Sequence, residues 1–188
     1  NYILAYFLLK LNMKKFLLCV ALFLPFLSIA QVEQANLLGQ WSDDENILMV
    51  GWLQSRYNEV WGVAINGREY GIIGSSIGTH IFDVTDPANS TEVEFISGAS
   101  GQVIHRDYHD YQGYLYIVCD EGSPSTLQIV DISNLPTSVN IVYDSNNLLN
   151  KVHNIFIDTA TAKLYACATG EAMEVFSLTN PNNPTLIY

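Results

Sequence analysis

Cysteine and basic residues are both scarce in this sequence. Cysteine occurs three times in 188 residues, which excludes a framework of several disulfides. Lysine and arginine together number 8 against 19 acidic residues, giving a formal net charge of −11. A surface this acidic repels nucleic-acid phosphates and anionic lipids, so we expect neither as a partner. The fold must therefore be stabilised by its core, and we interpret the charge as solubilising.

The sequence also lacks a long uninterrupted apolar run. Residues 1–30 are largely apolar, but Lys10, Lys14, Lys15 and Pro25 interrupt them. A transmembrane helix needs about 20 consecutive apolar residues, so a membrane anchor is the less favoured interpretation of this segment. We expect no membrane span in the rest of the chain.

Residues 13–30 instead have the organisation of a secretory signal peptide. Met13-Lys14-Lys15 gives the positive start, residues 16–27 the apolar middle, and residues 28–30 a small-residue cleavage site. We predict cleavage after Ala30 and a secreted or cell-surface location. The chain starts with Asn1 rather than methionine, so residues 1–12 are interpreted as an upstream extension, and their translation is left open.

Loss of residues 1–30 would make the remaining part, 31–188, still more acidic. Three lysines would go, leaving five basic residues against all 19 acidic ones, a formal net charge of −14. Cation binding is one interpretation of this charge, and the loop at residues 43–46 has the residue types of a calcium loop. It lacks the regular ligand spacing of such a loop. We therefore predict no metal and no cofactor.

Three segments of the chain are variants of one unit: 57–100, 102–147 and 150–188. Phe82 precedes Val130 by 48 residues, and Val130 precedes Phe176 by 46. Periods of this length are typical of propellers and solenoids. The matching segments, each followed by a turn containing proline, are Ile81-Phe82-Asp83-Val84, Ile129-Val130-Asp131-Ile132 and Val175-Phe176-Ser177-Leu178.

Each unit contains four short runs of β-branched and aromatic residues separated by turn residues, which indicates strands. The two central runs are continuously apolar, so both of their faces must be covered. The fourth run alternates, as at residues 91–96, and is typical of a half-exposed edge. We predict an all-β fold, a β-propeller of four-stranded antiparallel blades, with a β-sandwich as the alternative. In the middle unit the predicted strands are 103–110, 114–119, 126–132 and 139–143.

The predicted propeller is incomplete. Closed propellers have typically 4–8 blades, and about three are visible here. Residues 36–53 resemble a fourth strand without the first three, and we expect them to close the last blade. The chain ends inside the fourth strand of the third unit. We therefore expect the sequence to be the N-terminal portion of a longer protein, without its C-terminal anchor.

The two cysteines of the repeat region are expected to be free. Aligning Tyr116 with Tyr165 puts Cys119 one position out of phase with Cys167. Neighbouring strand positions point to opposite faces, so a disulfide between blades is not expected. We predict that both are small buried hydrophobic side chains.

The units resemble the LVIVD repeat of the choice-of-anchor B proteins. The similarity covers about residues 36–188 in order. It implies an exported bacterial β-propeller held at or released from the cell surface, with no established enzymatic activity. The landmarks that carry it are Leu127-Gln128-Ile129-Val130-Asp131-Ile132-Ser133-Asn134, Tyr57-Asn58-Glu59-Val60-Trp61-Gly62, Gly67-Arg68-Glu69-Tyr70, Gly78-Thr79-His80-Ile81-Phe82-Asp83, Arg106-Asp107 and His153-Asn154-Ile155-Phe156-Ile157-Asp158.

The candidate binding residues lie at the start of the first strand of each unit. Repeat alignment places Trp61, His105 and His153 at one position, where the first strands of a propeller line the central channel. We hypothesise a ligand face at one mouth of this channel. For the polar residues an alternative is a structural role, hydrogen bonding to the backbone between blades. The full set of candidates is Trp61, His105, Arg106, Asp107, His153 and Asn154.

Metal binding and catalysis are less favoured for the same region. On a strand, His105 and His109 share a face but lie about 13 Å apart, too far to chelate one ion. Asp107 or Asp110 with a histidine is conceivable as an acid–base pair. No nucleophile motif such as G-x-S-x-G occurs, and we assign no catalytic residue.

The sequence therefore predicts a non-enzymatic binding or interaction module. Its ligand would be an extracellular protein or glycan. Two alternatives stay open: a propeller hydrolase acting on sugars or esters through Asp107, Asp110 and His105, and a structural component of a surface layer.

Overall fold

The computed structural model describes residues 35–168 and 172–188. It divides into two units at Leu37/Leu38, and every described strand belongs to the second, Leu38–Tyr188. The predicted signal peptide at 13–30 and its upstream extension lie outside the described residues. Within them, no helix is both long enough and apolar enough to cross a membrane.

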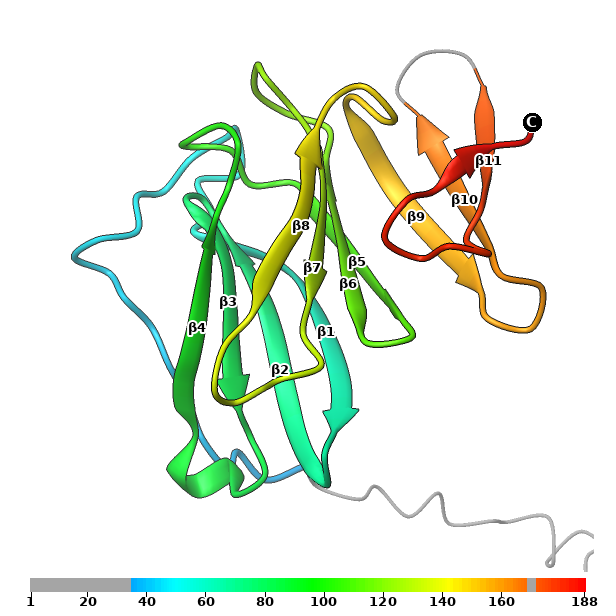
Figure 1. Ribbon diagram of the computed structural model, residues 1–188. Helices are drawn as coiled ribbons and strands as arrows, with labels where there is room; N and C mark the ends of the chain where they lie inside the picture. The colour runs from blue at the N-terminus through cyan, green and yellow to red at the C-terminus, as the bar shows by residue number, and fades with distance from the viewer. Residues whose placement is uncertain (1–34, 169–171) are drawn as a thin grey trace, which may run out of the picture. The chain divides into compact units, whose positions relative to one another are not determined.

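The second unit is built of three four-stranded antiparallel sheets, each with its strands in chain order (Figure 1). This confirms the predicted all-β class and the predicted four-stranded antiparallel sheets. A short 3-10 helix, η2 (Pro87–Asn89), lies between β3 and β4. The first sheet contains β1 (Tyr57–Ile65), β2 (Arg68–Ser75), β3 (Gly78–Asp83) and β4 (Thr91–Ser97); the second contains β5 (Arg106–Tyr111), β6 (Tyr114–Cys119), β7 (Leu127–Asp131) and β8 (Asn140–Ser145); the third contains β9 (Val152–Asp158), β10 (Lys163–Ala168), β11 (Met173–Ser177) and β12 (Thr185–Leu186).

The two central strands of the second sheet are buried on both faces. Leu115, Ile117 and Val130 belong to the hydrophobic core that it shares with the first sheet. Tyr116 and Ile129, the neighbours of these residues in sequence, belong to the core shared with the third sheet. Successive strand residues point to opposite faces, so a run that is apolar at every position covers both. The continuous apolar runs of β6 and β7 thus reflect a sheet stacked between two others.

Each third strand ends in the same kind of turn. Its last side chain accepts a hydrogen bond from the backbone N–H two residues later, which fixes the turn locally. The aspartate at the end of β3 and β7 is therefore a turn residue. The three bonds run from Thr85 to Asp83 at 3.0 Å, from Ser133 to Asp131 at 3.0 Å, and from Thr179 to Ser177 at 3.3 Å.

Residues 36–53, predicted to contain a closing strand, have no strand in the described structure, and Val50 forms only an isolated bridge with Ser55. Trp41 packs against Phe82, His80 and Tyr57, with ring centroids 4.7, 5.0 and 5.5 Å away. It therefore lies on the face of the first sheet opposite the shared core. Pairing of this segment with a further blade stays a prediction.

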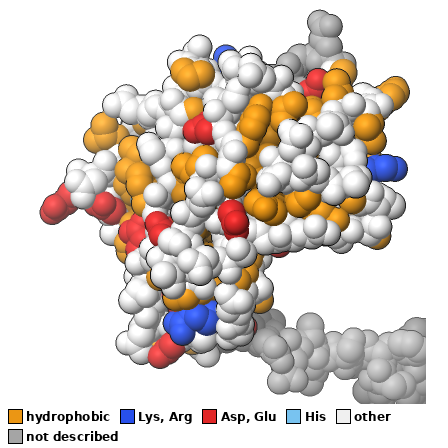
Figure 2. Space-filling model, in the orientation of Figure 1, with side chains coloured by type: hydrophobic (Ala, Val, Ile, Leu, Met, Phe, Trp, Pro, Cys, Tyr) orange, Lys and Arg blue, Asp and Glu red, His pale blue; other side chains and the backbone are white. Residues whose placement is uncertain are grey.

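The prediction that both cysteines of the repeat region are buried is wrong. Cys119 is half-buried, Cys167 is exposed, and both are free. Cys167 follows the fully buried Ala166 on β10, so it points away from the second sheet. Figure 2 shows hydrophobic side chains gathered over β8 and the third sheet, and the exposed apolar residues there include Ile141, Val142 and Met173.

Asp83 is expected to make the first sheet sensitive to acid. Hydrogen bonds from the Thr85 side chain and backbone, together with the Arg68 guanidinium, hold the pKa of Asp83 below its ordinary value. Because the pKa of Asp83 is lower in the folded state, its ionised side chain stabilises the fold at pH values above the ordinary aspartate pKa of about 3.9. This stabilisation is lost as the pH falls through the folded-state pKa. Between about pH 5 and pH 2.5, the wild type should therefore lose more thermal stability than Asp83→Asn. Melting curves across this range test it, and equal losses in the two proteins would contradict it.

Candidate functional site

Strand pairing fixes which residues of the three sheets correspond. The turn residues Asp83, Asp131 and Ser177 pair with the second-strand residues Tyr70, Tyr114 and Lys163. The residues two positions later on the second strands are Ile72, Tyr116 and Tyr165. Each of them also pairs with a residue of the first strand of its sheet. Those partners are Trp61 on β1, His109 on β5 and Phe156 on β9. The predicted correspondence of Trp61 with His105 and His153 is therefore wrong.

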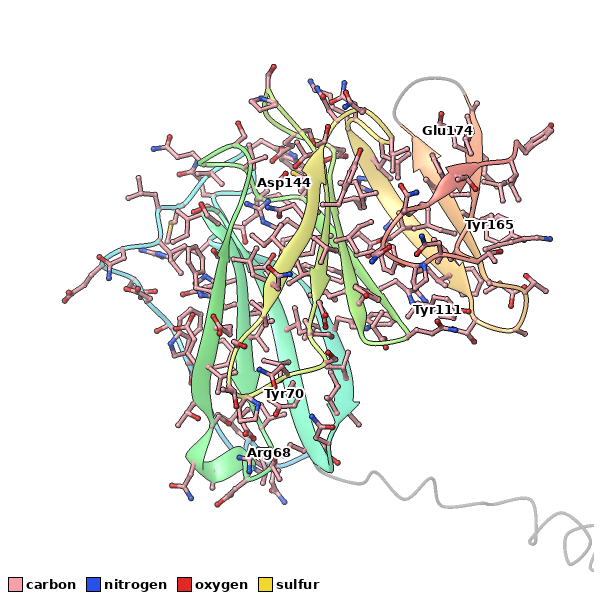
Figure 3. All side chains as sticks on the ribbon, viewed as in Figure 1. Arg68, Tyr70, Tyr111, Asp144, Tyr165 and Glu174 are labelled. Carbon is pink, nitrogen blue, oxygen red and sulfur yellow. The ribbon has the colours of Figure 1, made fainter. Side chains whose placement is uncertain are left out.

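These three corresponding residues form an aromatic row across neighbouring sheets. The ring centroids of Trp61 and His109 lie 4.7 Å apart, and those of His109 and Phe156 lie 5.7 Å apart. Tyr165, labelled on the third sheet in Figure 3, continues the row, with its ring 6.4 Å from that of Phe156. We use "aromatic row" for Trp61, His109, Phe156 and Tyr165.

The row is accessible, and its first ring is held in place. Phe156 is 60% exposed, and the other three side chains are half-buried. The indole N–H of Trp61 donates to Asp110 Oδ1 at 3.0 Å, and His109 Nδ1 lies 3.1 Å from the Asp110 carbonyl oxygen. The exposed ring of Phe156 contributes little to folding but offers a large apolar face to a ligand at low entropic cost. The row is thus the feature of the first strands best suited to binding.

A second group, the histidine cluster, consists of His105, His153, Asp120 and Glu121. His153 Nδ1 lies 2.6 Å from Asp120 Oδ2, and His105 Nδ1 lies 3.4 Å from Asp120 Oδ1 and 3.5 Å from Glu121 Oε1. The structure therefore brings the two predicted histidines together, with ring centroids 6.1 Å apart. It does so around two acids that sequence reasoning missed. Strand pairing could have indicated them. In an antiparallel pair the start of β5 lies beside the end of β6, so Asp120 and Glu121, which follow β6, lie near His105.

Arg106 and Asp107 do not face an open channel mouth. Arg106 is 5% exposed, and its backbone N–H donates to Asn58 Oδ1 at 3.1 Å. Asp107 is 9% exposed, and its Oδ2 accepts from the backbone N–H of Ile155 at 2.6 Å and from Asn154 Nδ2 at 3.5 Å. These contacts join neighbouring sheets, which corresponds to the structural alternative raised for these residues. Asn154 itself is exposed beside Asp107.

The acids of β5 do not converge on a common point. Asp107 binds backbone of the third sheet, whereas Asp110 binds the Trp61 indole of the first. A hydrolase mechanism needs an acid and a base positioned around one reacting atom, and this arrangement does not provide them. Among the described residues, no three His, Cys, Asp or Glu side chains are arranged to hold a metal ion.

The fold and site define a class: an all-β protein of three similar sheets whose corresponding first-strand positions carry aromatic rings, of which Phe156 is exposed and Trp61 and His109 are half-buried. Comparison with protein-family models and with curated proteins gave no match.

Proposed function

We propose that this chain belongs to an exported β-propeller of the LVIVD-repeat, choice-of-anchor B type. The proposal assigns it to the cell surface or the extracellular space as a non-enzymatic binding module. Three consecutive four-stranded sheets that stack face to face support the propeller, because each blade of a propeller covers the next. The signal-peptide pattern of residues 13–30 supports export.

The observation that carries the binding function is the aromatic row. Three corresponding positions hold three different rings, Trp61, His109 and Phe156, within 5.7 Å of their neighbours. Their apolar faces suit a ligand that is flat and partly apolar, and the acidic side chains of the protein disfavour an anionic one. A neutral glycan combines apolar ring faces with hydroxyl edges, so we assign this class of ligand to the row.

The histidine cluster would supply the polar part of the same surface. His105 lies four residues before His109 on the chain entering β5, and His153 lies three residues before Phe156 on β9. At about 3.3 Å per residue, the cluster is roughly 10–13 Å from the row along these strands, within the span of a short oligosaccharide. Imidazole and carboxylate groups can donate to or accept from sugar hydroxyls.

Co-sedimentation with microcrystalline cellulose and with chitin tests the proposal. We expect the wild-type chain to sediment with at least one of the two polysaccharides. Trp61→Ala and Phe156→Ala should each lower the association constant about five- to tenfold, because loss of a stacking ring costs about 1–1.5 kcal/mol of binding free energy.

Phe95→Ala provides the matched control. Phe95 is a 44% exposed aromatic residue on β4, outside both the row and the histidine cluster, so its removal should leave sedimentation unchanged. Failure of the wild type to sediment with either polysaccharide would refute the glycan assignment. Equal losses in the row variants and in Phe95→Ala would refute the row as the site.

A further inference from the structure

Arg106 is a buried cation without an acidic partner. Its side chain lies between the first and second sheets, where Nε donates to the Gly78 carbonyl oxygen at 3.2 Å. Its Nη2 is buried and has no hydrogen-bond partner. Among the described residues, no carboxylate lies within ion-pair distance of this guanidinium, whereas Arg56 and Arg68 each have one. An arginine cannot lose its proton in a protein, so the charge persists in the buried site.

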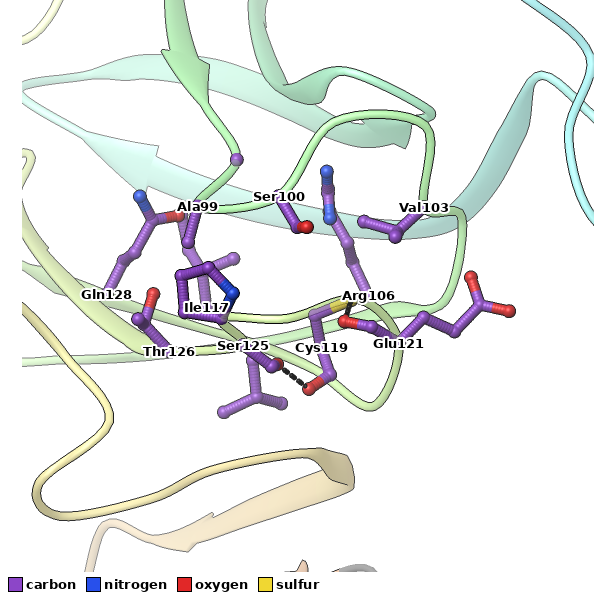
Figure 4. A pocket seen from close by; sticks show the side chains of 13 residues that line it. Ala99, Ser100, Val103, Arg106, Ile117, Cys119, Glu121, Ser125, Thr126 and Gln128 are labelled. Atoms are coloured by element: carbon purple, nitrogen blue, oxygen red, sulfur yellow. Dashed lines mark hydrogen bonds between the residues drawn. The ribbon is translucent and has the colours of Figure 1, made fainter.

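A small cavity adjoins this guanidinium (Figure 4). It lies between the chain entering β5 and the loop that joins β6 to β7. The buried side chains of Arg106, Ser125 and Gln128 line its inner part, and the exposed residues Ala99 and Pro124 lie at its rim. Solvent species therefore have a route to the arginine.

Most of the other polar side chains that line the cavity already have hydrogen-bond partners. Gln128 Nε2 donates to the Ser97 carbonyl oxygen and to Asp144 Oδ2, and Ser125 Oγ donates to the Cys119 carbonyl oxygen. Glu121, which also lines the cavity, directs Oε2 to the backbone N–H of Ile104 at 2.8 Å. The donors left for an occupant are the Arg106 guanidinium and the hydroxyl of Ser100.

We propose that this cavity binds one small inorganic anion of the halide class. A buried charge is tolerated when it is paired, and a water molecule would satisfy Nη2 without neutralising the guanidinium. The cavity is small, about 10 Å³, which is room for a single water-sized species. Carboxylate, phosphate and sulfate groups are too large for it, whereas chloride exceeds water by only a few tenths of an ångström in radius. The anion would join the first and second sheets through Arg106.

Thermal unfolding in sodium chloride and in sodium gluconate at equal ionic strength tests the site. Gluconate is too bulky to enter, so its salt controls for general screening. We expect a melting temperature higher by about 3 °C in chloride, as an anion that binds only the folded state at roughly tenfold its Kd would produce. Chloride-35 NMR of the same protein should show excess line broadening that bromide displaces.

Two variants locate the anion. Arg106→Gln should abolish both the chloride-dependent stabilisation and the line broadening, and Ser100→Ala should weaken chloride binding several-fold. Arg68→Gln removes the same charge where a carboxylate partner is present, so it should keep the full chloride response. If Arg106→Gln does not fold, the wild-type measurements and the chloride affinity of Ser100→Ala test the proposal. Equal melting temperatures in the two salts without line broadening, or a chloride response that persists in Arg106→Gln, would overturn the proposal.

Discussion

Replacement of Phe176 by alanine is expected to lower the free energy of unfolding by about 3–5 kcal/mol. Phe176 on β11 is 1% exposed and belongs to the core between the second and third sheets, together with Tyr116 and Ile129. Truncation of its ring loses the transfer free energy of the buried atoms and leaves a cavity that the surrounding β-sheets fill only in part. Urea unfolding followed by circular dichroism measures the change.

Phe156→Ala is the matched control for this substitution. It removes the same side chain from the same sheet, but Phe156 is 60% exposed. We expect it to change the free energy of unfolding by no more than about 0.5–1 kcal/mol. Similar losses in the two variants would show that the third sheet does not pack on the second through Phe176.

Asp107→Ala is expected to destabilise the protein by about 1.5–3 kcal/mol, the usual range for a hydrogen bond to a charged group. The Asp107 carboxylate accepts from the backbone N–H of Ile155, and Ile155 is itself buried. Its removal leaves that N–H without a partner inside the joint between two sheets. Urea unfolding again provides the measurement.

Asp107→Asn separates the hydrogen bond from the charge. Its side-chain oxygen can still accept from Ile155, so we expect about half the loss of the alanine variant to be recovered. Asp44→Ala, which removes an exposed carboxylate with a distant partner at 3.6 Å, should stay within about 0.5 kcal/mol of the wild type. A loss in Asp107→Ala no larger than in Asp44→Ala would contradict the role of Asp107 between the sheets.

The sheets could be predicted because their signals are local and repeated. Four β-branched runs per unit, the third followed by a turn containing proline, are readable without tertiary information. In the second unit, predicted strands at 103–110, 114–119, 126–132 and 139–143 correspond to β5, β6, β7 and β8 within three residues at each end. The continuous apolar runs also indicated that the central strands are covered on both faces.

The site was harder to predict because the first strands share no common residue type. Their corresponding positions hold a tryptophan, a histidine and a phenylalanine, and chemical similarity led to His105 in place of His109. The 48-residue period between Phe82 and Val130, applied to Trp61, leads directly to His109. Asp120 was missed because it lies in a loop, where nothing in the repeat marks it. Cys167 was misjudged because burial depends on which face of the third sheet is covered.

The separation between the turn after each third strand and the aromatic row has an evolutionary consequence. The turn keeps nearly the same chemistry in all three units, while the row position carries a different side chain in each. After duplication of an ancestral unit, mutations at the row position would alter recognition without cost to the strand pairing. Each copy could then diverge on its own, and the combined surface would come to differ from anything a single copy presents.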